Sequence, residues 1–175
     1  GWYYLSTILD DYSRYIIAWK LAPTMGASDV EETLELALEK SGLEKARVRH
    51  RPRLLSDNGP AYLSKELKKF LKRKDIEHIR GAPYHPMTQG KIERYHRSLK
   101  NIVKLQHYYS PSQLTEAITD FVEYYNNQRY HESLDNMTPA VIFYGKEKEV
   151  QSKREKIKRE TMALRRQQNL VPVGV

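Results

Sequence analysis

Apolar and polar residues alternate most clearly at the start of the chain. Residues 2–9 (WYYLSTIL) and 14–21 (RYIIAWKL) are rich in aromatic and β-branched side chains, which favour strands. The polar residues 10–13 between them predict a hairpin turn. We interpret Asp10 and Asp11 first as turn residues, and a role in metal binding is the alternative.

In the next part of the chain, apolar residues recur with helical spacing in two segments, and short strands are predicted beside them. Ser28 is the predicted N-cap of a helix that ends at Gly42. A short buried strand is predicted over residues 52–56, and a brief strand over 76–79 follows a second helix that Ser64 caps. This alternation favours an α/β domain, and the opening hairpin makes its sheet mixed. The expected buried positions of the two helices are Val30, Leu34, Ala37, Leu38, Leu67, Phe70 and Leu71.

Two further helices are predicted in the second half, after a loop over residues 81–90. The second of them follows Pro111. The segment YNNQRYHESL interrupts the helical pattern before a last short helix. We interpret Asn126, Arg129 and His131 in this segment as structural, with DNA contact as the alternative. The expected apolar positions of the first helix are Ile92, Tyr95, Leu99, Ile102 and Val103.

The charge balance indicates a polyanionic partner. The 175 residues carry a formal net charge of +8, which favours nucleic acid first. The absence of cysteine excludes disulfides, thiol catalysis and Cys-based zinc sites. The sequence has no apolar run of about 18 residues and its N-terminal segment lacks a basic start. We therefore expect no membrane span; a cytoplasmic, DNA-associated protein of bacterial type is what the resemblance given below implies.

A basic segment follows the rest of the chain. KEKEVQSKREKIKRETMALRRQQ, from Lys146 on, contains nine Lys and Arg against four Glu. This composition predicts a solvent-exposed helix or a frayed tail. We divide the chain into a core over residues 1–145 and this basic tail or helix over 146–175. The tail is expected to bind DNA non-specifically or to lead to a C-terminal module.

Two acids in the middle of the chain are the candidates for chemistry. Asp57 follows the strand over residues 52–56, and ligands collect at the C-terminal ends of strands in open α/β sheets. Glu93 falls in the first turns of a helix, with 35 residues between the two acids. Such a pair can converge on a hard divalent cation. Glu93 shares one helix face with Arg97 and Lys100. The alternatives are a turn residue at Asp57 and a plain ion pair at Glu93.

Three motifs extend this interpretation. SDNGPAY, PYHPMTQGKIERYHRSLK and YNNQRYHESLDNMTPAVIFYG resemble the catalytic core of retroviral-type integrases and insertion-sequence transposases, the DDE enzymes with D-35-E spacing. The resemblance covers about residues 2–145 and implies an RNase-H-like mixed sheet flanked by helices. It makes Asp57 the second and Glu93 the third metal-binding, catalytic acid of the family. The implied cofactor is a pair of Mg²⁺ or Mn²⁺ ions.

The same resemblance implies contacts with DNA. Arg97 and Lys100 match helix positions that face DNA in the family, and we add Lys91 of the same motif. Tyr84 and His85 are suited to stacking on or bonding to a splayed nucleotide, and a simple turn is the alternative. The implied partners are transposon ends and target DNA, bound by a homo-oligomer.

One acid of the family pattern is expected outside this sequence. The family's first Asp lies on a strand that would precede Trp2, so we expect the N-terminal strand and the first acid to be missing. The expected function is metal-dependent phosphoryl transfer, with DNA cleavage and strand transfer, by an incomplete core. The alternatives are a non-catalytic DNA-binding remnant and an RNase-H-like nuclease.

Overall fold

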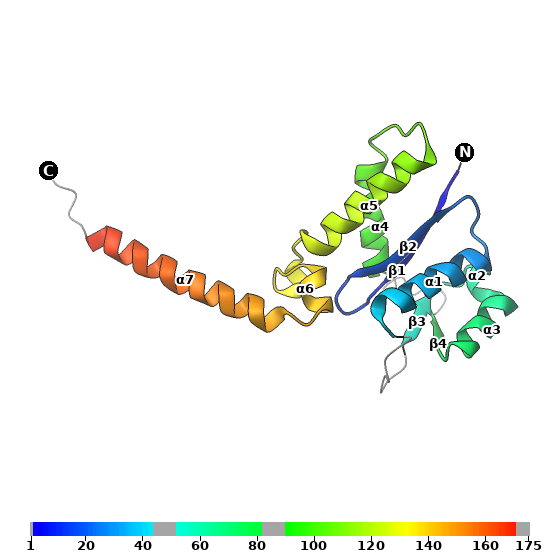
Figure 1. Cartoon of the computed structure of the whole chain (residues 1–175), viewed down its shortest axis with the longest axis horizontal. Helices are drawn as coiled ribbons and strands as arrows, with labels where there is room; N and C mark the ends of the chain where they lie inside the picture. Colours follow the sequence, from blue (N-terminus) through cyan, green and yellow to red (C-terminus); the bar gives the residue numbers. More distant parts are fainter. Residues whose placement is uncertain (1, 44–51, 82–89, 171–175) are drawn as a thin grey trace.

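The chain forms two small sheets with helices around them (Figure 1). The computed structural model describes residues 2–43, 52–81 and 90–170. The predicted hairpin, the two helices of the first half and the later helices are all found. The elements are β1 Tyr4–Leu9, β2 Ile16–Ala22, α1 Ala27–Ser41, β3 Arg53–Ser56, α2 Pro60–Leu63, α3 Lys65–Arg73, β4 Glu77–Arg80, α4 Gly90–Val103, α5 Pro111–Asn127, the 3-10 helix η2 Glu132–Leu134, α6 Pro139–Phe143 and α7 Glu147–Leu170.

The hairpin β1–β2 is antiparallel, and its turn is closed by a side chain. The pairing runs from Tyr4 opposite Ala22 to Leu9 opposite Ile16. The Asp10 carboxylate accepts hydrogen bonds from the Ser13 backbone N–H at 2.7 Å and from the Ser13 hydroxyl at 2.6 Å. A short acidic side chain that bonds its own turn in this way is a turn residue. The interpretation of Asp10 as a turn residue is therefore confirmed.

The hairpin lies between two helical layers (Figure 1). Side chains on one face pack with α1 and α3, and those on the other face pack with α4 and α5, because successive strand residues point to opposite faces. All seven buried positions predicted for α1 and α3 are buried. The core against α4 and α5 contains Ile16, Tyr95, Leu99, Val103, Ile118, Phe121, Val122 and Tyr125.

The N-terminus of α1 differs from the prediction. The N-cap is Gly26, so the predicted N-cap Ser28 is wrong and lies inside the first turn. The cause is Asp29, whose carboxylate accepts the Gly26 N–H at 3.0 Å and the Thr24 hydroxyl at 2.8 Å. The Gly26 hydrogen bond first, and then that of Thr24, holds the pKa of Asp29 below its usual value. A helix start can thus be fixed from its third residue as well as from its cap.

The second sheet pairs β3 with β4 in parallel, from Arg53 opposite Glu77 to Ser56 opposite Arg80. Within the described residues it is not joined to the hairpin. The prediction that β3 is a buried strand is wrong for Leu55, which is 39% exposed. Leu54 packs against the α1–α3 core, so its neighbour Leu55 must point to the opposite, less covered face.

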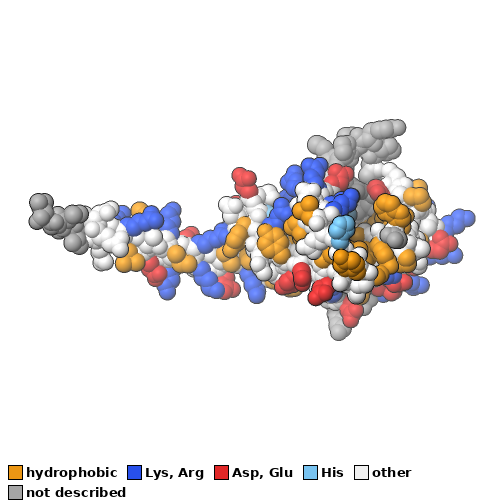
Figure 2. All heavy atoms as spheres, turned by 90° about the horizontal axis from the view of Figure 1, so that it is seen from above, with side chains coloured by type: hydrophobic (Ala, Val, Ile, Leu, Met, Phe, Trp, Pro, Cys, Tyr) orange, Lys and Arg blue, Asp and Glu red, His pale blue; other side chains and the backbone are white. Residues whose placement is uncertain are grey.

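Helix α7 extends away from the rest of the chain (Figure 1). Its surface mixes Lys and Arg with acidic and apolar side chains (Figure 2). The Arg154 guanidinium donates hydrogen bonds to the carbonyl oxygens of Asp135 and Asn136, which fixes the start of the helix beside η2. Ile157 and Leu164 on this helix are 61% and 57% exposed. The division of the chain at residues 145 and 146 stays a prediction.

Candidate active site

Asp57 lies directly after β3, where its neighbours fix the backbone. The buried Ser56 hydroxyl donates to the Asp57 carbonyl oxygen at 2.8 Å and lies 2.8 Å from His78 Nε2 on β4. Since the Ser56 proton goes to that carbonyl, His78 Nε2 donates to Ser56 Oγ. Burial, followed by the charges of Arg80 and Lys68, lowers the pKa of His78. A neutral His78 therefore supports the end of the strand that carries Asp57.

The turn after Asp57 fixes the carboxylate itself. Asp57 Oδ1 accepts the Gly59 N–H at 2.8 Å, and the Asn58 side chain donates to the Gly81 carbonyl at 3.1 Å. A Cβ at position 59 would lie 2.9 Å from Asp57 Oδ1, closer than real Cβ contacts. The predicted turn is confirmed, and glycine at position 59 leaves room for the carboxylate. Asp57 is exposed and keeps oxygen lone pairs for a cation.

Glu93 lies in the first turn of α4, which is anchored by its apolar face. Tyr95, Leu99 and Val103 are buried in the core, as predicted. The prediction fails for Ile102, which is 47% exposed, because Val103 is the residue of this last turn that points to the core. Glu93 itself is exposed to solvent.

Two cations share the Glu93 face without being neutralised by it. Arg97 and Lys100, one and two turns after Glu93, are both exposed. In the part of the chain that the structure describes, neither forms an ion pair with Glu93. The alternative interpretation of Glu93, a plain ion pair with Arg97, is therefore not found. This face presents one carboxylate and two positive charges to solvent.

Lys91 has a partner that the sequence pattern did not reveal. Its ammonium group lies 2.7 Å from Asp11 Oδ2 and donates to the Asp11 carbonyl at 2.8 Å. This contact ties the first turn of α4 to the hairpin turn, across 80 positions of sequence. The Asp11 carboxylate is thus paired with the Lys91 ammonium group. A DNA contact by Lys91 stays a prediction.

The residues fit a divalent cation only in part. Two exposed carboxylates are donors of the kind that Mg²⁺ takes together with water and phosphate oxygens. Among the residues that the structure describes, no three acidic or imidazole groups lie together as a metal site. The number of ions, expected to be two, stays a prediction. Tyr84 and His85 lie outside the described residues, so their proposed DNA contacts stay predictions.

A second buried cluster joins the hairpin to α5. Asn126 Oδ1 accepts the Ile16 N–H at 2.9 Å, and Asn126 Nδ2 donates to the Ile16 carbonyl at 3.0 Å. The structural interpretation of Asn126 is confirmed. The Arg129 guanidinium carbon lies 5.5 Å from the centre of the Tyr125 ring, and the His131 ring meets the same ring edge-on at 5.1 Å.

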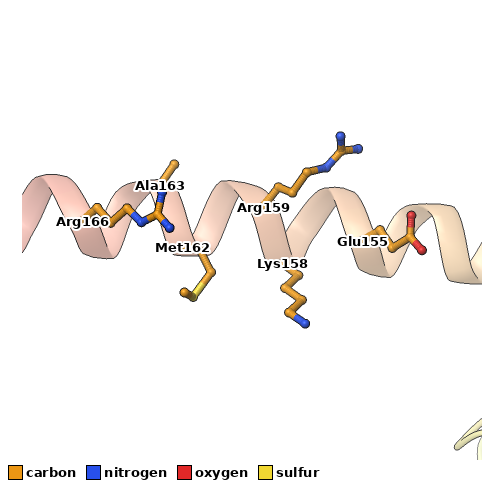
Figure 3. Close-up of a pocket in the computed structure, with 6 residues that line it drawn as sticks. All are labelled: Glu155, Lys158, Arg159, Met162, Ala163 and Arg166. Carbon is orange, nitrogen blue, oxygen red and sulfur yellow. The ribbon is translucent and has the colours of Figure 1, made fainter.

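One surface depression lies outside these clusters, along α7. Its lining comes from this single helix, with Lys158 and Met162 pointing to one side and Arg159 to the other (Figure 3). A depression formed by one helix does not enclose a ligand, so it is not a candidate site. No helix within the described ranges has the length and apolar character needed to cross a membrane.

Comparisons with known proteins agree with this architecture. Two family models, both described as integrase core domain, match residues 1–86 and 74–139. The first match includes Asp57 and the second includes Glu93. The chain is 34% identical over 116 residues to the Gag-Pro-Pol polyprotein of mouse mammary tumor virus, which covers 63% of this chain and 6% of that protein.

Bacterial transposases match over a longer stretch. The putative transposase InsK of insertion sequence element IS150, from Escherichia coli, is 26% identical over 137 residues, or 78% of this chain and 47% of the relative. InsF of insertion sequence IS3A, from the same species, is 27% identical over 141 residues. The chain thus spans about half of these transposases and a small part of the viral polyproteins.

Solved structures confirm the predicted fold class. The catalytic core domain of BIV integrase aligns with a TM-score of 0.60 and 22% identity, covering 82% of this chain and 86% of that one. The HTLV-2 integrase catalytic core domain in complex with magnesium aligns with a TM-score of 0.63 and 21% identity, covering 81% and 84%. The fold is therefore RNase-H-like.

Proposed function

Because this chain belongs to the integrase core domain family, we propose that it is the DNA-integrating core of a transposase or integrase. The reaction is metal-dependent phosphoryl transfer, in which DNA is cleaved and its end is joined to a target. The observation that carries the proposal is the placement of the two acids. Asp57 stands on a strand end fixed by Ser56. Glu93 stands on a helix face with two cations that form no ion pair among the described residues.

Each side chain has a role that its surroundings support. Asp57 and Glu93 would hold a divalent cation, which supplies charge stabilisation and an activated oxygen nucleophile when bound. Arg97 and Lys100 would bind the phosphates next to the scissile bond, because both are exposed and free of acidic partners among the described residues. The Gly59 hydrogen bond keeps the Asp57 carboxylate oriented before any ligand arrives.

The chain spans about half of its transposase relatives, so the activity of a whole enzyme is part of the proposal. The family pattern assigns three acids, and two of them are assigned here. We propose DNA as the partner and a homo-oligomer as the working unit. The oligomer is supported by the HTLV-2 integrase core, a neighbour whose structures are described as dimeric and trimeric forms. The number of metal ions also belongs to the proposal.

Paramagnetic broadening by Mn²⁺ tests the site directly in this chain. We expect Mn²⁺ to broaden the NMR signals of Gly59 and of the first turn of α4. Asp57→Asn should reduce this broadening, because it removes a charged oxygen ligand. Asp120→Asn, an exposed change on α5, is the matched control. Broadening that is equal in both variants would contradict the assignment.

Activity is tested in the intact enzyme that contains this core. Asp57→Asn should abolish strand transfer while leaving DNA binding largely intact, since the carboxylate serves the reaction and not the affinity. Full strand transfer by that variant would refute the proposed role.

A non-catalytic DNA-binding remnant is the second candidate. It is favoured by one observation, the lack of a three-ligand metal cluster among the described residues. This candidate predicts DNA binding with no response of the Gly59 signals to Mn²⁺, so the same titration separates it from the first.

A further inference from the structure

One ion pair joins the hairpin turn to the first turn of α4. The Lys91 ammonium group lies 2.7 Å from Asp11 Oδ2 and donates to the Asp11 carbonyl oxygen at 2.8 Å. The two side chains are 39% and 69% exposed, and an exposed ion pair adds little to the stability of a protein. What this pair can do therefore depends on the two segments that it connects.

The hairpin side of the contact is a rigid turn. The Asp10 carboxylate accepts two hydrogen bonds from Ser13, at 2.7 and 2.6 Å, and Ser13 is fully buried. The Asp10 N–H donates to the Tyr15 carbonyl at 2.8 Å, and the Arg14 N–H donates to the Asp10 carbonyl at 2.8 Å. Asp11 lies between these bonded positions. Its carbonyl and carboxylate oxygens therefore form a fixed receptor for an ammonium group.

The α4 side of the contact is a turn that its own helix secures poorly. The first four N–H groups of a helix have no acceptor within it, and α4 begins with a glycine, Gly90. The buried side chains of α4 begin only at Tyr95. Within the described ranges, both hydrogen bonds that join residues 90–93 to another element are made by Lys91. Lys91 therefore holds the turn that contains Glu93.

The contact also leaves the Glu93 carboxylate accessible. Residues two positions apart in a helix lie on different faces, so Lys91 bonded to the hairpin turn does not cover Glu93. In the described part of the chain the two form no ion pair, and Glu93 is exposed. The link can thus fix the backbone below Glu93 without neutralising its charge.

We propose that Asp11 is a positioning residue, which orders the first turn of α4, and with it Glu93, through Lys91. Without the link, Glu93 is in place for only part of the time, and a ligand of Glu93 binds less tightly in proportion to that fraction. The ammonium group has three N–H donors and uses two here, so this role is compatible with the DNA contact predicted for Lys91. The ordering of the turn does not depend on the proposed function, whereas its value for a metal ion rests on it.

NMR relaxation of the metal-free full chain tests the ordering. We expect Asp11→Ala to lower the order parameter S² of the Ile92 and Glu93 N–H groups from about 0.85 toward about 0.6. The Leu99 N–H should keep its value. Lys91→Gln should have the same effect, whereas Lys91→Arg should keep the turn ordered, because a guanidinium group can still donate to both Asp11 oxygens. Unchanged values in Asp11→Ala, or an equal fall at Leu99, would overturn the proposal.

Glu149→Gln is the matched control. Glu149 pairs with Lys153 at 2.6 Å on α7, where both side chains are exposed. The variant therefore removes an exposed carboxylate–ammonium pair and one negative charge outside α4. It should leave the order parameters of the first turn of α4 unchanged. A fall as large as that in Asp11→Ala would show an effect of net charge and would overturn the role of the link.

Mn²⁺ titration of the same chain tests the consequence for the metal site. The loss of an exposed ion pair changes an equilibrium by roughly two- to fivefold, so Asp11→Ala should weaken Mn²⁺ binding by about this factor. Glu93→Gln removes the ligand itself and should weaken binding by roughly tenfold or more. Equal losses in the two variants, or an unchanged affinity in Asp11→Ala, would overturn the role of Asp11 at the metal site. If the unmodified chain does not bind Mn²⁺, the proposed function fails, while the order parameters still decide whether Asp11 orders the turn.

Discussion

Asn126 joins the hairpin to α5, and Asn126→Ala is predicted to be strongly destabilising. The side chain is buried and satisfies both backbone groups of Ile16, at 2.9 and 3.0 Å. Alanine would leave an N–H and a C=O buried without partners, at about 1–3 kcal/mol each. We therefore expect the free energy of unfolding to fall by roughly 2–5 kcal/mol. At about 2–4 °C per kcal/mol, the melting temperature should fall by roughly 5–15 °C.

Urea unfolding followed by circular dichroism measures this change. Asn127→Ala is the control, because the neighbouring Asn127 is exposed and its side chain bonds, among the described residues, only to Glu123 of its own helix. That variant should change stability by less than about 0.5 kcal/mol. Similar midpoints for the two variants would refute the reasoning, since they would show that the Ile16 backbone groups find other partners at no cost.

Two further predictions concern the site and its surroundings. Gly59→Ala should lower metal-dependent strand transfer of the intact enzyme by roughly tenfold or more, because the new Cβ displaces Asp57 Oδ1. Gly90→Ala is the control and should keep the activity, because a Cβ at position 90 meets no described atom within 4 Å. Equal activities of the two variants would contradict the steric argument. The lowered pKa of His131 means that the unfolded chain binds a proton before the folded chain does as pH falls. Stability should therefore decrease from pH 6.5 to about 4, and His131→Gln should reduce the proton uptake on unfolding near pH 5 by about one. Urea unfolding at several pH values measures the free energy of unfolding of both proteins. The same pH dependence of this free energy in His131→Gln and in the unmodified chain would refute the role of His131.

The hairpin and the helices could be predicted because each is specified by a pattern within its own segment of sequence. Alternation of aromatic and branched residues is enough to indicate the hairpin, and the apolar period is enough to indicate α1 and α3. The N-cap of α1 was missed because the deciding group is the Asp29 side chain, which reaches back to Gly26. A capping preference at Ser28 says nothing about that geometry.

The other failures come from contacts between distant segments. Lys91 binds Asp11 across 80 positions, and no periodic pattern connects them. The Ser56–His78 contact depends on the register of two parallel strands, which the sequence does not specify. The exposure of Leu55 depends on what covers the second face of β3. The candidate acids were found from motifs, whereas their supporting residues required the structure.

The length of α7 has a consequence for any duplex that this chain binds. Its 24 residues span about 36 Å at 1.5 Å per residue, close to one full turn of B-DNA. A duplex lying parallel to α7 would present the same face of its double helix at both ends of the protein helix. Lys148 and Arg166 lie about 27 Å apart along this helix, so their positive charges would meet phosphates about three quarters of a turn apart. The full length of α7, and not the spacing of these two charges, is what matches the DNA repeat.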